Sequence, residues 1–226
     1  MRVTNACKLI SQSTKTVYIH PAKCAGKSIE HVLFNFPKGG KSDHSRAWEY
    51  RYRHFPKLDT EKIPQFFYFS FVRNPWSRYV SSLFDRALRI DPENLKPEDI
   101  NVDFVKSCLL KDLDCIKNSL HPPCAGGGMA PYREFFCSLD GNYLMNFVGK
   151  LENIESDWTT LRDKIQDFNN VDIKNWPKKL IKLNHKKHSE RKHYSFYYDE
   201  ESEKLLKNIY SWDIEFFDYK FEDKSK

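Results

Sequence analysis

Residues 69–82 read FSFVRNPWSRYVSS and join a strand to a helix through a short turn. The apolar, aromatic run Phe66–Val72 is typical of a buried strand. The turn Arg73–Pro75 follows, and proline is favoured in the first turn of a helix because its missing amide is not needed there. Apolar side chains then recur at helical spacing through Trp76–Leu88. This stretch therefore predicts a strand that ends at an arginine and leads directly into a helix.

The same order of strand, turn and helix occurs earlier in the chain. Thr16–Ile19 is a short β-prone run, and Ser28–Phe34 carries apolar residues on one helical face. Further on we predict a strand at Asn142–Val148 and helices at Asp157–Phe168 and Glu200–Phe217. Strands that alternate with helices predict an α/β fold with a mainly parallel central sheet covered on both faces. In such folds ligands bind at the carboxyl ends of the strands, where both turns lie.

Composition narrows the function classes. The chain has 226 residues, 40% of them hydrophobic, and a net charge of +6. We expect one globular domain over residues 1–226, and no nucleic-acid partner because the charge is small and dispersed. No apolar stretch approaches the roughly 20 residues of a membrane span, and the start of the chain has no secretory signal, so we expect a cytoplasmic protein without a membrane partner. The six cysteines include no C-x-x-C pair, and we expect no metal site.

The loop at residues 20–28, HPAKCAGKS, has the features of a phosphate-binding loop. Small residues let backbone amides approach an anion at a helix start, and two lysines add positive charge. The predicted anion-binding residues are Lys23, Cys24, Ala25, Gly26, Lys27 and Ser28. The last three fit the end of the Walker A pattern, but Pro21 stands where its first glycine belongs. An ATP-dependent P-loop kinase stays as one alternative, and an ordinary turn in which Ser28 is the N-cap as another.

A second anion site is predicted around Arg73 and Ser81. Arg73 ends a strand and Ser81 lies two turns into the following helix, so a guanidinium and a hydroxyl can hold one phosphate. We expect Arg78 to brace the turn rather than to touch a ligand. The alternative is that Arg73 only caps carbonyl groups and Ser81 is a surface hydroxyl. Two phosphate sites predict a doubly anionic nucleotide.

Both motifs resemble those of the carbohydrate-type (family 2) sulfotransferases. Residues 69–82 match the family pattern F-x-x-V-R-N/D-P-x-x-R-x-x-S at every defined position. Residues 20–28 are similar to the family's 5′-phosphosulfate loop, with the proline one place early and Lys23 at the family lysine. Residues 140–154 and 191–221 resemble later family segments, so the likeness runs from about Val17 to Phe221. It implies a P-loop-like, three-layer α/β/α fold that binds 3′-phosphoadenosine 5′-phosphosulfate (PAPS) and releases the bisphosphate PAP.

The resemblance also implies roles for individual residues. Sulfuryl transfer is an in-line displacement, so the protein positions donor and acceptor, stabilises the leaving oxygen and removes a proton. Lys23 is predicted to stabilise the leaving group, and no Mg²⁺ is required. The base is predicted to be His44, in a segment similar to one that carries a catalytic histidine in some glycan sulfotransferases, with Glu30 and His31 in reserve.

Arg191 and Lys192 lie in a basic loop before the last helix, which in many sulfotransferases closes over the nucleotide. A solvated basic face is the alternative interpretation of this segment. The acceptor is predicted to be a hydroxyl, with an amine as second choice, on a glycan or a small molecule. Acceptor pockets are built from variable loops, so its identity stays open, as does the oligomeric state. A non-catalytic, sulfotransferase-like module that binds an anion is the third function hypothesis.

Overall fold

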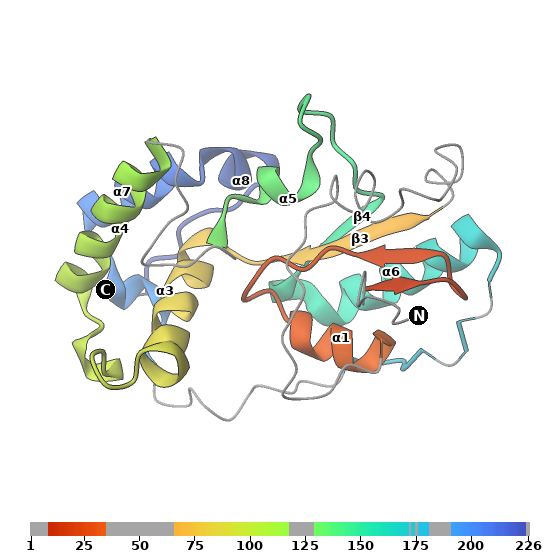
Figure 1. The fold of residues 1–226 in the computed structure, drawn as a ribbon, viewed down its shortest axis with the longest axis horizontal. Coiled ribbons are helices and arrows are strands. Elements are labelled where there is room, and N and C mark those ends of the chain that lie inside the picture. Colours follow the sequence, from red (N-terminus) through yellow and green to blue (C-terminus); the bar gives the residue numbers. More distant parts are fainter. Residues whose placement is uncertain are drawn as a thin grey trace, which may run out of the picture. The chain divides into compact units, whose positions relative to one another are not determined.

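The computed structural model of the chain describes residues 9–34, 66–117, 129–171, 173–174, 176–180 and 191–224. The chain forms two compact units, each built from two separate segments (Figure 1). Unit 1 comprises residues 1–72 and 134–187, and unit 2 comprises residues 73–133 and 188–226. The expectation of a single domain over residues 1–226 stays a prediction.

Unit 1 contains the sheet. Its strands are β1 (Ile10–Ser11), β2 (Thr16–Tyr18), β3 (Phe67–Val72) and β4 (Phe147–Lys150), in the order β1-β2-β3-β4. β1 pairs antiparallel with β2, whereas β2 with β3 and β3 with β4 are parallel. This mostly parallel sheet, flanked by helices, confirms the predicted α/β class and is consistent with a P-loop-like fold.

Two helices of unit 1 pack against the sheet strands. They are α1 (Gly26–Phe34), which follows β2, and α6 (Ile154–Asn169), which follows β4 through the short 3-10 helix η6 (Leu151–Asn153). β3 is buried along its whole length, and the ring of Phe67 meets that of Phe168 of α6 at 5.3 Å between centroids. At Gly149 of β4 an added Cβ would lie 2.6 Å from the Phe71 ring, so glycine allows this close packing.

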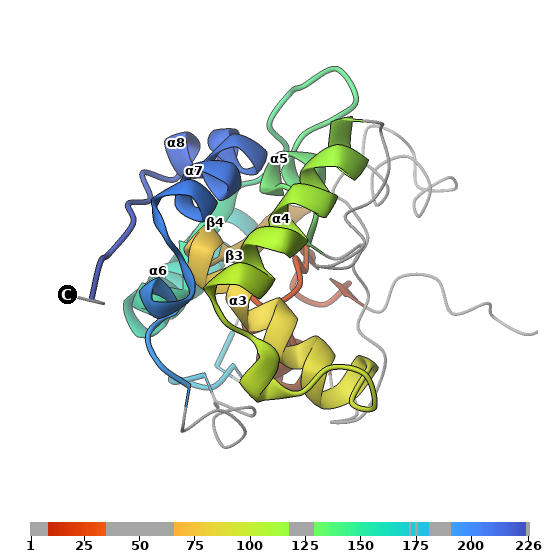
Figure 2. The same cartoon turned by 90° about the vertical axis from the view of Figure 1, so that its left-hand side faces the viewer.

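The described part of unit 2 is helical. Its helices are α3 (Pro75–Asp85), the π-helix η3 (Arg86–Ile90), the 3-10 helix η4 (Pro97–Asp99), α4 (Val102–Lys117), the 3-10 helix η8 (Tyr194–Tyr197), α7 (Glu200–Ile209) and α8 (Ser211–Phe216). The short α5 (Tyr132–Phe136) contains the boundary between the units. α4 packs against α7, as Figure 2 shows. The buried Tyr79 hydroxyl of α3 donates a 2.7 Å hydrogen bond to Asp112 of α4, which joins these two helices.

The predicted strand Asn142–Val148 is wrong in its first half, because only Phe147–Lys150 forms β4. The preceding residues turn back on their own chain: the Leu144 amide donates to the Phe136 carbonyl, and Cys137 pairs with Tyr143 as an isolated bridge. Where the sheet would continue, the side chain of Asn146 accepts the Tyr68 amide at 2.8 Å. Local pairing therefore replaces the first half of the predicted strand.

The predicted helix Glu200–Phe217 is interrupted at Tyr210, whose φ of −113° and ψ of 29° are not helical. Hydrogen bonds to another part of unit 2 lie at the break and just after it. The Tyr210 hydroxyl donates to the Met129 carbonyl, and the buried Asp213 carboxylate accepts the Tyr132 amide at 2.8 Å. These tertiary bonds outweigh the local tendency to continue one helix.

None of the helices in the described ranges is both long enough and apolar enough to span a bilayer.

Candidate functional site

The loop between β2 and α1 has a strained backbone. Lys23 and Ala25 have positive φ values of 68° and 61°, whereas the intervening Cys24 does not. Residues other than glycine rarely take this conformation, which costs about 1–2 kcal/mol each. In anion-binding nests of known proteins, left-handed residues alternate with right-handed ones, and successive backbone amides turn toward one side. The strain therefore lies where the sequence predicts anion binding.

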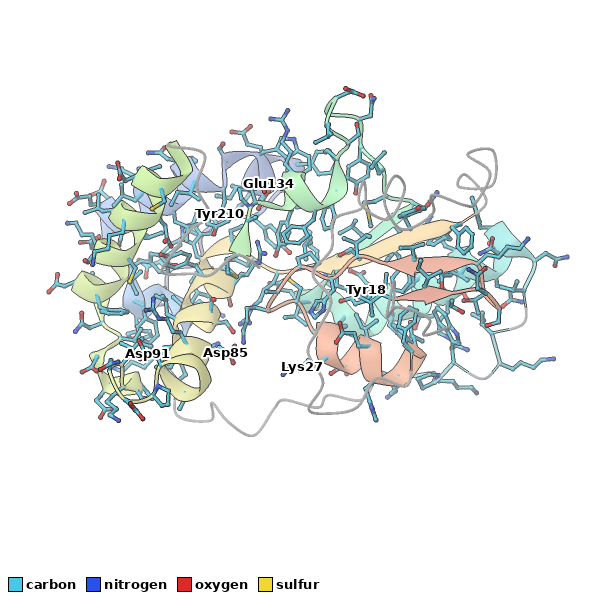
Figure 3. The ribbon with its side chains drawn as sticks, in the orientation of Figure 1. Tyr18, Lys27, Asp85, Asp91, Glu134 and Tyr210 are labelled. Carbon is cyan, nitrogen blue, oxygen red and sulfur yellow. The ribbon has the colours of Figure 1, made fainter. Side chains whose placement is uncertain are left out.

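The start of α1 follows this loop directly. The amides of Ser28 and Ile29 both donate to the Ala25 carbonyl, at 2.9 and 3.3 Å. Since α1 begins at Gly26, Ser28 lies in the first turn, and the alternative in which it is the N-cap is wrong. The amides of Gly26 and Lys27 come first in the helix and have no intrahelical acceptor. Figure 3 labels Lys27 at this end of α1, where the helix dipole favours an anion.

A buried pair lies beside the loop. His20 and Glu30 are 3% and 1% exposed, and His20 Nδ1 lies 2.8 Å from Glu30 Oε1. The imidazole stacks on the buried Tyr18 ring at 5.6 Å and 19°. The structure thus places Glu30, one of the reserve candidates for the base, in the interior with His20, whereas His31 is half-buried.

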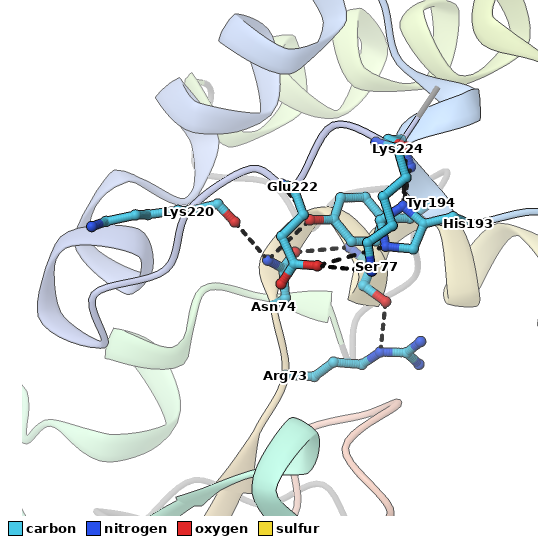
Figure 4. Close-up of polar contacts among 9 residues, drawn as sticks. Arg73, Asn74, Ser77, His193, Tyr194, Lys220, Glu222 and Lys224 are labelled. Atoms are coloured by element: carbon cyan, nitrogen blue, oxygen red, sulfur yellow. Dashed lines mark hydrogen bonds and ion pairs between the residues drawn. The ribbon is translucent and has the colours of Figure 1, made fainter. Parts of the chain in front are cut away.

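The predicted second site is held by hydrogen bonds within unit 2. The Tyr132 hydroxyl accepts from the Arg73 amide and donates to the Arg73 carbonyl, both at 2.9 Å. The Arg73 Nε donates to Ser77 Oγ at 3.0 Å (Figure 4). Ser77 lies one helical turn before Ser81 on the same side of α3, and Ser81 is 6% exposed. The turn therefore fixes the arginine backbone and directs its side chain along α3.

Neighbouring residues brace this turn. Asn74 is the N-cap of α3: its Oδ1 accepts from the Ser77 amide, and its Nδ2 donates to the Lys220 carbonyl at 3.0 Å. Arg78 is 1% exposed, donates to the Ala130 carbonyl and lies 4.3 Å from the centroid of the Tyr132 ring. These contacts are of the kind that the predicted bracing role requires, and that role stays a prediction.

Arg191 lies close to Arg73. Burial and the positive charge of Arg73 lower the pKa of the Arg191 guanidinium from 12.5 to about 10. This guanidinium lies 5.4 Å from the centroid of the Phe84 ring, and its buried Nη1 has no hydrogen-bond partner. A buried donor without an acceptor, beside a second cation, is an arrangement that an anion would relieve. The ammonium of Lys192 instead lies 5.4 Å from the centroid of the exposed Phe196 ring.

A family model described as the sulfotransferase family matches residues 9–220, which include both loops and Arg191. The chain belongs to the sulfotransferase family. Members of this family use PAPS as donor, so the protein is a PAPS-dependent transferase, and the ATP-dependent kinase hypothesis is set aside. No curated protein and no solved structure matches the chain.

The residues of the two predicted anion sites lie one set in each unit. The strained loop with Lys23 and Lys27 lies in unit 1, and the buried, unsatisfied donor of Arg191 lies near Arg73 in unit 2. His44 lies outside the described residues, so its role as base stays a prediction. Within the described ranges, no group of three His, Cys, Asp or Glu side chains could hold a metal ion.

Sequence reasoning did not assign a role to Ser77 or Tyr132. Ser77 could have been found, because it lies four residues before Ser81 and hence on the same helix face as a predicted ligand. Tyr132 could not, since its contact with Arg73 joins residues 59 positions apart in the chain. The positive φ values of Lys23 and Ala25 carried no sequence signal either, because neither residue is glycine.

Proposed function

We propose that this sulfotransferase moves the sulfuryl group of PAPS to a hydroxyl group of a glycan or small-molecule acceptor, with an amine as second choice. The observation that carries the donor-binding part of the proposal is the buried Nη1 of Arg191, which has no partner and lies near the like charge of Arg73. An anion supplies both a hydrogen-bond acceptor for this Nη1 and a negative charge that offsets the repulsion between the two arginines.

The 3′-phosphate of the donor is assigned to unit 2. Arg73 and Arg191 supply charged donors, and Ser81 supplies a hydroxyl from α3. Hydrogen bonds between a guanidinium and a phosphate are roughly twice as strong as neutral ones, and the planar fork of arginine gives them a direction. Ser77 accepts a hydrogen bond from the Nε of Arg73 and so fixes the direction of this guanidinium along α3. This arrangement selects a nucleotide that carries a 3′-phosphate.

The 5′ end of the donor is assigned to the loop in unit 1. Its backbone amides from Cys24 to Ser28, with Lys23 and Lys27, would surround the phosphate that bears the sulfuryl group. During transfer, negative charge builds up on the oxygen that leaves with the nucleotide, and Lys23 stabilises that charge. PAPS supplies the activated sulfuryl group, so the protein contributes positioning, electrostatics and a base.

The role of the base that removes the proton of the acceptor hydroxyl is assigned to His44. A neutral imidazole near pH 7 accepts a proton readily, and this histidine lies between the two loop motifs in the sequence. Glu30 is disfavoured as a base because its carboxylate is 1% exposed and hydrogen-bonded to His20. The Arg191–Lys192 segment contributes Arg191 to the donor site, whereas Lys192 is assigned only a peripheral electrostatic role.

Calorimetric titration of PAP tests the donor site. Wild-type protein should bind PAP without metal, and Arg73→Ala should weaken binding by about a hundredfold, since it removes a charged, directional contact. Arg133→Ala is the matched control, because it removes the same charge from an exposed position of unit 2 and should leave the affinity unchanged. Binding of Mg²⁺-ATP but not PAP would reinstate the kinase hypothesis, and binding of neither nucleotide would favour the non-catalytic module.

A transfer assay tests the acceptor class and the base. PAPS is supplied with sugars, phenols or amines, and sulfated product is detected by mass spectrometry. We expect a sulfated hydroxyl, whereas products on amines alone would contradict the proposal. His44→Ala should abolish turnover without changing PAP affinity, and unchanged turnover would exclude His44 as the base.

A further inference from the structure

We propose that His20 and Glu30 act together as positioning residues that hold the 5′-phosphosulfate loop in its anion-binding shape. The proposal rests on the function assigned above to residues 23–28. Neither side chain is placed in contact with donor or acceptor. Their role is to fix the backbone from which the loop amides point.

The first step concerns the orientation of the imidazole. Its Nδ1 lies 2.8 Å from the Glu30 carboxylate, and both side chains are almost fully buried. A buried carboxylate is costly unless it is paired and hydrogen-bonded, so Glu30 requires this partner. The Tyr18 ring stacks on the imidazole and restricts its tilt. With one edge and one face fixed, the opposite edge of the ring has a defined position.

That opposite edge meets the loop at Gly26. A Cβ placed on Gly26 would overlap Nε2, Cδ2 and Cε1 of His20, so no other residue fits there without moving the ring or the backbone. Gly26 does not have a positive φ, and a left-handed conformation therefore does not explain why glycine is present. The close approach of the imidazole does. His20 thus sets how near the start of α1 comes to the end of β2.

The third step links this contact to the strain in the loop. Between His20 and Gly26 lie the two residues with positive φ, Lys23 and Ala25. Strained residues persist only where the surrounding structure over-determines them. Glu30 ties His20 to α1, and the ring holds Gly26, so both ends of the five intervening residues are fixed. Loss of the ring or of its carboxylate partner would release the loop toward unstrained conformations whose amides no longer converge.

Two mononucleotides separate this role from general stability. Adenosine 5′-monophosphate carries only the phosphate assigned to the loop, and adenosine 3′-monophosphate carries only the one assigned to Arg73 and Arg191. His20→Ala and Glu30→Ala should each weaken binding of PAP and of the 5′-monophosphate by about tenfold or more, as expected when one partner of a buried hydrogen bond is lost. Affinity for the 3′-monophosphate should stay within about twofold. Equal affinities of wild type and variants for the 5′-monophosphate would overturn the proposal.

Conservative variants and a matched control sharpen the test. Glu30→Gln keeps an oxygen acceptor for His20 and should retain most of the 5′-monophosphate affinity, whereas His20→Gln keeps a polar group but lacks the ring and should not. Tyr79→Phe removes a buried hydrogen bond to a carboxylate in unit 2 and should leave 5′-monophosphate affinity unchanged. If His20→Ala does not fold, His20→Gln decides the outcome. Full affinity in that variant overturns the proposal.

A double-mutant cycle tests the contact itself. Gly26→Ala alone should reduce binding of the 5′-monophosphate sharply, because the new methyl group collides with the imidazole. In the His20→Ala background, where the ring is absent, the same substitution should cost much less. Equal costs in both backgrounds would overturn the proposal. If wild-type protein binds neither PAP nor the 5′-monophosphate, the proposed function fails instead, so the two failures are distinguishable.

Discussion

Arg73 and Arg191 are an unfavourable pair in the free protein. Burial removes water from the charged guanidinium of Arg191, and the like charge of Arg73 repels it, which is why the pKa of Arg191 falls to about 10. The unsatisfied Nη1 adds the cost of a buried donor. Such costs are tolerated at functional sites, where a ligand removes them. At the scale of single residues, we therefore expect stability and donor binding to oppose each other.

Arg191→Met tests this opposition. Methionine still packs on the Phe84 ring but removes the repulsion and the buried donor, so the free energy of unfolding of the ligand-free protein should rise by about 1 kcal/mol. The guanidinium is charged in the folded state at all pH values below about 10, so its cost is fully present there and the gain should be the same at pH 6 and pH 8. Denaturation without PAP measures the gain in stability, and denaturation with PAP measures the opposing loss of donor binding. Arg133→Met is the control, and a less stable ligand-free variant would contradict the argument.

Helix α7, which follows Arg191, Lys192 and η8 in the chain, is stabilised at its start. Asp199 is the N-cap of α7, and its Oδ1 accepts hydrogen bonds from the Ser202 amide at 2.7 Å and from the Ser202 hydroxyl at 2.6 Å. These bonds favour the ionised carboxylate and lower its pKa from the usual 3.8. Stability from this cap is therefore fully present above about pH 4 and is lost as the pH falls through the lowered value.

We expect Asp199→Ala to lower the free energy of unfolding by about 1 kcal/mol at pH 7. Asp199→Asn should lower it less, because asparagine is also a good N-cap, and should not share the loss below pH 4. Urea denaturation of the three proteins at pH 7 and pH 3 compares these effects. Lys106→Met serves as control, because Lys106 forms ion pairs with Asp199 and Glu201 and takes no part in the cap. If the control reproduced the full loss, the ion pairs rather than the cap would be responsible.

Local patterns were sufficient for the elements that carry the two loops. β2 and β3 lie within one residue of the predicted bounds. The spacing of apolar residues and the β-prone residue types within each segment are enough to predict these strands. β4 and the break at Tyr210 depend on partners distant in sequence, such as Tyr68 and Met129, and no local pattern encodes those. The same holds for the site. The motifs predicted Arg73 and the loop at residues 20–28, whereas the pairing of His20 with Glu30 and the proximity of Arg191 to Arg73 needed the tertiary structure.

At the scale of the whole molecule, unit 2 brings the second motif together with the C-terminal region. Asn74 donates to the Lys220 carbonyl 146 residues later, and Trp76 Nε1 to the Glu203 carbonyl 127 residues later. The ring of Phe221 meets those of Trp76, Tyr194 and Tyr198 at 5.5–5.8 Å. The amides of Glu222 and Lys224 donate to the hydroxyls of Tyr194 and Ser195 in η8 (Figure 4). The C-terminal segment 219–224 thus supports both Asn74 and the helix that follows Arg191.

Asn74→Asp should detach this segment while keeping the cap of α3. A carboxylate still accepts the Ser77 amide, but it cannot donate to the Lys220 carbonyl and would repel it. We expect hydrogen exchange at the amides of Glu222 and Lys224 to accelerate by about tenfold, and PAP affinity to fall because Arg73 loses part of its support. Asn146→Asp is the matched control in unit 1, where the side chain serves the Tyr68 amide as an acceptor and no change in these two amides is expected. Unaltered exchange in Asn74→Asp would show that Phe221 and the η8 contacts hold the segment without Asn74, and the support of Arg73 would then be assigned to contacts such as those with Tyr132 and Ser77.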